Sequence, residues 1–408
     1  MKRAVAGGPG VLLLVAVLLV AFNLRGAIAA VSPVLPEIRT DLGMSGTVAG
    51  LLTTLPVLCF AVLAPVAAWL GQRLGTDRAI LLACLVIALG TVGRVLGGSW
   101  TLLIGTVVVG AAMTVGNVLV PVVAKRDFGG HAGRITGLFT AALCAGAATT
   151  AALTAPISSA SSWRIGLAGW ALLAIVAAIV WRIAMVRRNT VTASASAAGA
   201  TGLAGPADPT GRGVWRSPLA WSVALFLGAQ GAAYYAVTAW LPTLLIRQID
   251  TDLETAGLAA AVFQILGIAG TLLAAGLVSF RRRQGWLAGL VAGGWAVLLA
   301  GLLWWPAAWL LWTVIGGVAQ GAGIALALTL VVLRSHDAAV ARGLSAMAQF
   351  VGYSIGAAGP LVVGILYEQT GSWTAPLVLL LGLAGCMALT GGIAGRDATV
   401  GAPVPRQN

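Results

Sequence analysis

The sequence predicts an all-α integral membrane protein with twelve transmembrane helices in two pseudo-symmetric six-helix bundles. Three observations carry this prediction: the composition, the spacing of the apolar stretches, and a repeat between the two halves of the chain. Of the 408 residues, 59% are hydrophobic and only 9% are charged, whereas about a quarter of the residues in a soluble domain are charged. Such a chain must be solvated largely by lipid.

Composition also limits the partners. The 55 glycines follow no collagen period, and small residues of this kind let transmembrane helices approach closely. A formal charge of +13 suggests nucleic acid in a soluble protein, but here the basic residues lie in short gaps between apolar stretches, as cytoplasmic loop anchors do. The four cysteines are far apart inside apolar stretches, which indicates neither disulfides nor a metal site. We expect no nucleic acid, metal or cofactor.

Apolar stretches of about 20 residues, long enough to cross a bilayer, occur twelve times along the chain. All should be helices, because backbone groups exposed to lipid must be hydrogen-bonded internally, and the stretches are too long and too uniformly apolar for barrel strands. The predicted spans are 11–34, 46–70, 79–98, 101–124, 135–157, 165–186, 218–245, 256–279, 286–304, 307–333, 343–366 and 374–394.

The orientation follows from the positive charges between the spans. Only three of the 24 Lys and Arg residues, Arg39, Arg164 and Arg247, fall in loops on one side, and Arg25 and Arg94 lie inside spans. The others lie on the side that carries both termini. The positive-inside rule therefore places both termini in the cytoplasm.

The longest polar gap divides the chain into two halves. Residues 187–216 are rich in Ala, Ser, Thr, Gly and Pro, a composition typical of a flexible linker. We therefore expect an N-terminal six-helix bundle (1–186), a cytoplasmic linker (187–216), a C-terminal six-helix bundle (217–396) and a cytoplasmic tail (397–408).

The two halves also repeat in sequence. Leu35-Pro36 ends the first span as Leu241-Pro242 ends the seventh, and Thr40-Asp41-Leu42 precedes the second span as Thr251-Asp252-Leu253 precedes the eighth. Two parallel six-helix repeats joined by a cytoplasmic linker are typical of the major facilitator fold.

Several short motifs occur along nearly the whole chain. They are Phe22-Asn23-Leu24-Arg25, Gly116-Asn117-Val118-Leu119-Val120-Pro121 with Lys125-Arg126-Asp127-Phe128, Ala239-Trp240-Leu241-Pro242, Ala325-Leu326-Ala327-Leu328-Thr329 and Leu344-Ser345-Ala346-Met347-Ala348-Gln349. Through these motifs the chain resembles the cyanate/2-nitroimidazole porter family of that superfamily. The resemblance implies transport of a small solute and leaves the identity of that solute open.

The membrane interior contains a base but no acid. All eleven carboxylates lie in loops or at span ends, whereas Arg25 lies deep in the first span. An arginine there costs about 2.5–3.5 kcal/mol by insertion scales, so it faces a wet cavity or a partner. Arg25 is either an anchor for an anionic or electron-rich solute, or a structural group that caps carbonyls or pairs with an outer acid such as Glu37. Asn23 is about 200° away around the helix, and it contacts either the solute or a neighbouring helix.

The seventh span carries a stripe of polar and aromatic residues at four-residue intervals, Phe226, Gln230, Tyr234 and Thr238. In this fold the first, fourth, seventh and tenth spans line the central pathway, so the stripe is either the second-half wall of the site or a polar seam against another helix. Other candidates for contact with the solute are Asn117 and Gln320, with Gln264, Gln349 and Tyr353 as weaker ones.

Charged residues near the span ends are candidates for gates. Lys125, Arg126 and Asp127 lie at the inner mouth, where they either form gating ion pairs or anchor the loop in solvent, and Glu37 is the outer candidate. We expect Arg94, at the outer end of the third span, to extend its side chain to the membrane surface.

These observations predict a secondary transporter of the inner (plasma) membrane. We expect a monomer that moves a small anionic or polar planar solute by alternating access. The chain lacks a phosphate-binding loop, a zinc-protease motif and a catalytic triad at membrane depth, so we expect no enzyme. The alternatives are a multidrug exporter of the same fold and a solute sensor that does not transport.

Overall fold

The computed structural model describes residues 8–128, 132–193, 214–278, 283–336 and 338–400. Nearly all of these residues are helical, which confirms the predicted all-α class. The β-type pairing within these ranges is an isolated bridge between Ser335 and Val400.

The helices follow the predicted spans in order, and three spans consist of two helices each. The first half contains α1 (Gly8–Ala29), α2 (Val31–Leu42), α3 (Gly46–Val62), α4 (Ala64–Leu74), α5 (Thr76–Gly93), α6 (Ser99–Phe128), α7 (Ala132–Ala160), α8 (Trp163–Ala168) and α9 (Ala171–Ala193). The second half contains α11 (Pro218–Ile249), α12 (Leu253–Val278), α13 (Gly285–Trp304), the 3₁₀ turn η2 (Pro306–Ala308), α14 (Trp309–Leu333), α15 (Ala338–Thr370) and α16 (Thr374–Ala394).

Ten helices in the described ranges are long and apolar enough to cross a membrane, or eleven if α3 and α4, which meet at 60°, form one span. The predicted seventh span, α11, is not among them although it has 32 residues. Its polar side chains, with Gln230 near the middle, lower its mean hydropathy. The long helix that fails this test is therefore the one that the chain buries most completely.

Two of the helix breaks follow from proline. Pro33 lies in the first turn of α2 and Pro65 in the first turn of α4. A proline ring clashes with the carbonyl four residues before it and has no N–H to donate, so each proline interrupts the helix that precedes it. The break between α3 and α4 bends the second span by 60°.

Helix α9 continues to Ala193, beyond the predicted end of the sixth span at residue 186. Residues 194–213 lie outside the described part of the chain, so the linker over 187–216 stays a prediction.

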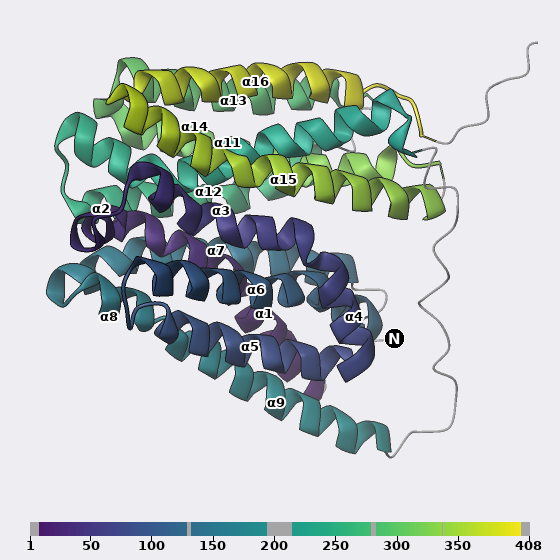
Figure 1. Cartoon of the computed structure of the whole chain (residues 1–408). Coiled ribbons are helices and arrows are strands. Elements are labelled where there is room, and N and C mark those ends of the chain that lie inside the picture. Colours follow the sequence, from purple (N-terminus) through teal and green to yellow (C-terminus); the bar gives the residue numbers. More distant parts are fainter. Residues whose placement is uncertain (1–7, 129–131, 194–213, 279–282, 337, 401–408) are drawn as a thin grey trace, which may run out of the picture.

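The two halves lie side by side as separate bundles, with α3 beside α15 and α7 beside α12 (Figure 1). Glycines bring these helices together at one end. A Cβ on Gly50 would lie 2.9 Å from the carbonyl oxygen of Pro360, and a Cβ on Gly257 would lie 3.0 Å from that of Ala151. We call this the closed end.

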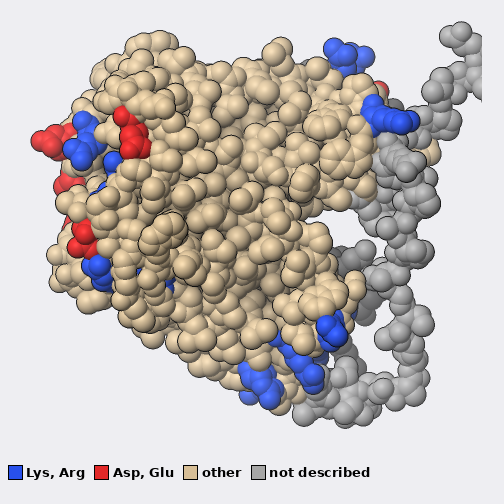
Figure 2. Space-filling view, in the orientation of Figure 1, with Lys and Arg blue, Asp and Glu red and all other residues tan. Residues whose placement is uncertain are grey.

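At the opposite end, where α4 and α9 end, the surface is hollowed between the two bundles (Figure 2). We call this the open end. Large apolar side chains cover much of the outside of the molecule; Leu89, Leu96 and Trp304, for example, are more than 70% exposed. Such a surface is suited to lipid rather than water.

The prediction for Arg94 was wrong. Its side chain is 1% exposed, and its Nη1 donates to the carbonyl oxygen of Ala27 at 3.4 Å. The arginine is buried because α6 packs directly against it: a Cβ on Gly105 would lie 2.3 Å from the Cβ of Arg94. Ala27 precedes the break between α1 and α2, so Arg94 bonds a carbonyl beside that break.

Candidate functional site

A cavity between the two halves brings five of the predicted site residues together. It contains about 360 Å³ of empty space, part of it open to solvent. The five predicted residues are Arg25, Gln230, Tyr234, Gln320 and the weaker candidate Tyr353. The rest of the lining consists of Leu227, Gly231, Tyr235, Ile324 and Gly352.

Arg25 is the contribution of the first half to this lining. Its guanidinium carbon lies 4.9 Å from the centre of the Tyr234 ring, close enough for a cation–π interaction. The thiol of Cys144 on α7 lies next to its guanidinium. None of the carboxylates in the described residues forms a salt bridge with Arg25. Its positive charge therefore faces the cavity without an acidic partner.

Close packing of α1 against α7 holds Arg25 in place. A Cβ on Gly146 would lie 2.0 Å from the carbonyl oxygen of Phe22, so only glycine fits between the two helices there. Thr150 then donates from its hydroxyl to the carbonyl oxygen of Gly26 at 3.0 Å. These contacts fix the backbone on both sides of Arg25.

Two residues of the stripe on α11, Gln230 and Tyr234, line the cavity and also bond neighbouring helices. Gln230 donates from Nε2 to the carbonyl oxygen of Gln320 at 2.9 Å and accepts at Oε1 from the indole of Trp295 at 2.7 Å. Tyr234 donates from its hydroxyl to Oε1 of Gln264 at 3.1 Å. These bonds hold the side chains rigidly where they border the cavity, as a preorganised site requires.

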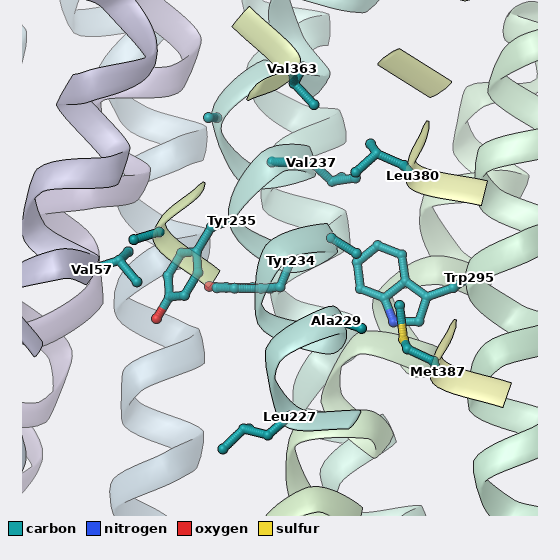
Figure 3. Close-up of a cluster of buried hydrophobic side chains, with 14 of the residues drawn as sticks. Val57, Leu227, Ala229, Tyr234, Tyr235, Val237, Trp295, Val363, Leu380 and Met387 are labelled. Carbon is teal, nitrogen blue, oxygen red and sulfur yellow. The ribbon is translucent and has the colours of Figure 1, made fainter. Parts of the chain in front are cut away.

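Aromatic rings form much of the remaining wall. Tyr234 and Tyr235 meet edge to face at 4.9 Å between ring centres, and Tyr235 extends from α11 toward Val57 of the first half (Figure 3). Tyr353 on α15 meets Phe60 on α3 edge to face at 5.9 Å. Three tyrosine rings of the second half therefore line the cavity with Arg25, which suits a flat solute.

Three predicted solute contacts lie away from this cavity. Asn23 donates from Nδ2 to the carbonyl oxygens of Leu19, at 2.8 Å, and of Leu173 on α9, at 3.5 Å. Phe226 is fully buried and packs against Gly391 of α16. Gln349 is exposed and donates to the Ser345 hydroxyl at 2.9 Å.

The fourth, Asn117, is partly buried on α6 and does not line this cavity. Its neighbour Gly116 packs against Leu24 of α1, so α6 supports the helix that carries Arg25.

The predicted gating residues that the structure describes pair within the first half. Arg126 forms ion pairs with Asp77 at 3.0 Å and with Asp127 at 2.7 Å, and Arg188 bonds both carboxylates. This cluster joins α5, α6 and α9 at the open end. The side chain of Lys125 lies outside the described part of the chain.

At the closed end, Glu37 accepts from the Ser158 hydroxyl at 2.5 Å, again within the first half. The contact that joins the two halves there was not predicted. Glu368 at the end of α15 accepts at Oε2 from the backbone N–H of Thr47 at 3.0 Å and from its hydroxyl at 2.7 Å. Nothing in the sequence indicates that Glu368 contacts Thr47, which lies 321 residues earlier in the chain.

The cavity can therefore bind a solute through one positive charge, amide and hydroxyl groups, and aromatic faces. The lining contains no acid and no histidine, and the described residues contain no group of His, Cys, Asp and Glu suited to a metal ion.

Comparison with known proteins agrees with this fold. Residues 17–357 match the family model of the Major Facilitator Superfamily. Among solved structures, the nucleoside transporter NupG has a TM-score of 0.75 and 11% identity, covering 94% of this chain and 100% of that one. A bacterial homologue of the lysosomal transporter Spinster in an inward-facing, unoccupied conformation has a TM-score of 0.67 and 16% identity, covering 97% and 96%.

Three relatives match nearly end to end. The uncharacterized transporter YycB of Bacillus subtilis is 35% identical over 94% of each chain. The 2-nitroimidazole transporter of Escherichia coli is 34% identical over 97% of this chain and 98% of its own. The cyanate transport protein CynX of Escherichia coli is 30% identical over 88% of this chain and 91% of its own.

Proposed function

The chain belongs to the Major Facilitator Superfamily of membrane transporters, and we propose that it moves a small, planar, anionic or strongly hydrogen-bond-accepting solute across the bacterial inner membrane. The observation that carries this proposal is the position of Arg25. Its guanidinium lies in a cavity between the two halves, and no carboxylate of the described residues forms an ion pair with it.

The names of two relatives support this solute class. Cyanate is a small anion, and 2-nitroimidazole is a flat ring with two acceptor oxygens. Both are small and rich in acceptors, and both suit a planar guanidinium flanked by tyrosine rings.

The two ends of the molecule support alternating access. At the closed end the halves are joined by Glu368 and Thr47 and by the glycine contacts of α3 with α15. Because most basic residues lie toward the open end, the positive-inside rule assigns this end to the cytoplasm. The structure then corresponds to an inward-facing state, in which the solute exchanges with the cytoplasm.

The aromatic wall favours a second candidate, a multidrug exporter. Tyr234, Tyr235 and Tyr353 offer rings to many flat compounds. A positive charge without a nearby acid disfavours cationic drugs, so this candidate is restricted to neutral or anionic compounds.

Proteoliposomes test the proposal. Purified protein should exchange radiolabelled cyanate and 2-nitroimidazole across the bilayer, and it should exclude 2-aminoimidazole, which has the same ring but carries a donor group and a positive charge. Equal exchange of 2-aminoimidazole would contradict the proposed solute class. Labelling of a Ser161→Cys variant by an impermeant reagent on intact cells tests the orientation, because Ser161 is exposed at the closed end.

A further inference from the structure

Trp295 lies behind the cavity wall and contacts Gln230 from outside. It belongs to α13, which contributes nothing to the lining, and its side chain is fully buried. Figure 3 shows it on the opposite side of α11 from Tyr235. Its Nε1–H donates to Oε1 of Gln230 at 2.7 Å.

This bond determines which way the Gln230 amide points. An indole N–H only donates, so the atom that faces it must be the amide oxygen. The Nε2 group then points to α14, where it donates to the carbonyl oxygen of Gln320 at 2.9 Å. A reversed amide would set N–H against N–H at Trp295 and oxygen against oxygen at Gln320.

Glycine makes room for the amide in this position. A Cβ on Gly323 of α14 would lie 2.4 Å from Oε1 of Gln230. The oxygen therefore faces Trp295, away from the cavity, and the nitrogen faces Gln320, which lines it. One of the two amide N–H groups bonds Gln320, and the second is available for a solute.

We propose that Trp295 is a positioning residue that holds Gln230 as a hydrogen-bond donor to the transported solute. The second half then presents an amide donor across the cavity from the guanidinium of Arg25, and the site selects solutes with acceptors on two edges. This inference rests on the proposed function. It adds Trp295, which determines that Gln230 presents a donor rather than an acceptor to the solute.

A double-mutant cycle tests the inference. Trp295→Phe keeps an aromatic ring but removes the N–H, so the amide is free to turn. We expect the affinity for 2-nitroimidazole to fall about fivefold, the equivalent of one hydrogen bond. The preference for 2-nitroimidazole over 2-aminoimidazole should fall as well. In a Gln230→Met background, Trp295→Phe should change the affinity less than twofold, because the amide on which it acts is absent.

Trp181→Phe is the matched control. Trp181 is also fully buried, and its N–H donates to the carbonyl oxygen of Asp77 at 3.0 Å, remote from the cavity. This variant should bind 2-nitroimidazole as the wild type does. Equal losses from Trp295→Phe in both backgrounds, or an unchanged affinity and preference in Trp295→Phe, would overturn the inference while leaving the proposed function intact.

Melting temperatures test the same contact without a solute. Trp295→Phe should lower the melting temperature in the wild-type background and lower it less in Gln230→Met. If the wild type binds neither cyanate nor 2-nitroimidazole, the proposed function is wrong. The melting temperatures still test the bond between Trp295 and the Gln230 amide. If Trp295→Phe lowers the melting temperature equally in the wild-type and Gln230→Met backgrounds, the proposed amide orientation is overturned.

Discussion

The contact of α3 with α15 at the closed end makes a specific prediction about Gly50. Alternating access requires this contact to form and separate in each cycle. A Cβ on Gly50 would lie 2.9 Å from the carbonyl oxygen of Pro360 and 3.2 Å from the Cα of Leu361. Both are backbone atoms that cannot move aside by a rotamer change. The Gly50→Ala methyl group therefore opposes closure of this end.

The magnitude follows from two opposing terms. Alanine favours a helix over glycine by about 1 kcal/mol, and this gain is present whether the end is closed or open. The added methyl group costs about 1–3 kcal/mol by overpacking, and this cost applies only when the end is closed. The ratio of closed to open molecules should therefore fall by about 5- to 150-fold.

Distances between spin labels measure this ratio. Labels at Ser161→Cys and Gln369→Cys sit at exposed positions on the two halves of the closed end, and three of the four native cysteines are buried. Gly50→Ala should shift the distance distribution toward longer values. Gly289→Ala is the control, because a Cβ on that helical glycine meets nothing within 4 Å. Identical distributions in the two variants would refute the reasoning.

Three further variants separate stability from binding. Asn23→Ala should lower the melting temperature and leave the affinity for 2-nitroimidazole within about twofold, because Asn23 bonds only backbone carbonyls; a large loss of affinity would place it in the site. Gly267→Ala should weaken binding about tenfold, because its Cβ would lie 1.9 Å from Nε2 of Gln320; isothermal titration checks this. Arg188→Gln should lower the melting temperature by removing the ion pair with Asp77, and equal melting temperatures in the variant and the wild type would contradict it.

Hydropathy predicted the helices well, because lipid requires about 20 apolar residues in each span and leaves no alternative backbone structure. Hydropathy did not predict the breaks within the spans. The breaks inside the first and second spans depend on Pro33 and Pro65, which the apolar count does not register. α11 differs in the other direction. Most of its residues are buried within the protein, where polar side chains can be hydrogen-bonded, so it needs a lower hydropathy than a helix that faces lipid.

The candidate site was predicted in part. Arg25 and Gln230 could be predicted from the sequence, because a charged or amide side chain inside a membrane span needs a polar environment. Residues four apart on an α-helix are about 40° apart around its axis, so the stripe on α11 winds away from the cavity. Phe226 is therefore about 80° from Tyr234 and faces α16, whereas Tyr235, outside the stripe, lines the cavity.

Contacts between helices that are far apart in the sequence were the least predictable part. The ion pair between Arg126 and Asp77 and the bonds from Thr47 to Glu368 join residues that are far apart in sequence. Their partners depend on how the bundles pack, and a single sequence contains no record of that packing. The burial of Arg94 has the same origin, because it depends on the approach of Gly105.

The most direct test of the account is the equilibrium affinity of purified protein for cyanate and 2-nitroimidazole in the wild type, Arg25→Lys and Arg25→Gln, compared at matched folding. Arg25→Lys keeps the charge but loses the planar pair of donors, so the account predicts a loss of about 1.5–3 kcal/mol, and at least as much for Arg25→Gln. An affinity of Arg25→Gln equal to that of the wild type would contradict the claim that this guanidinium binds the solute.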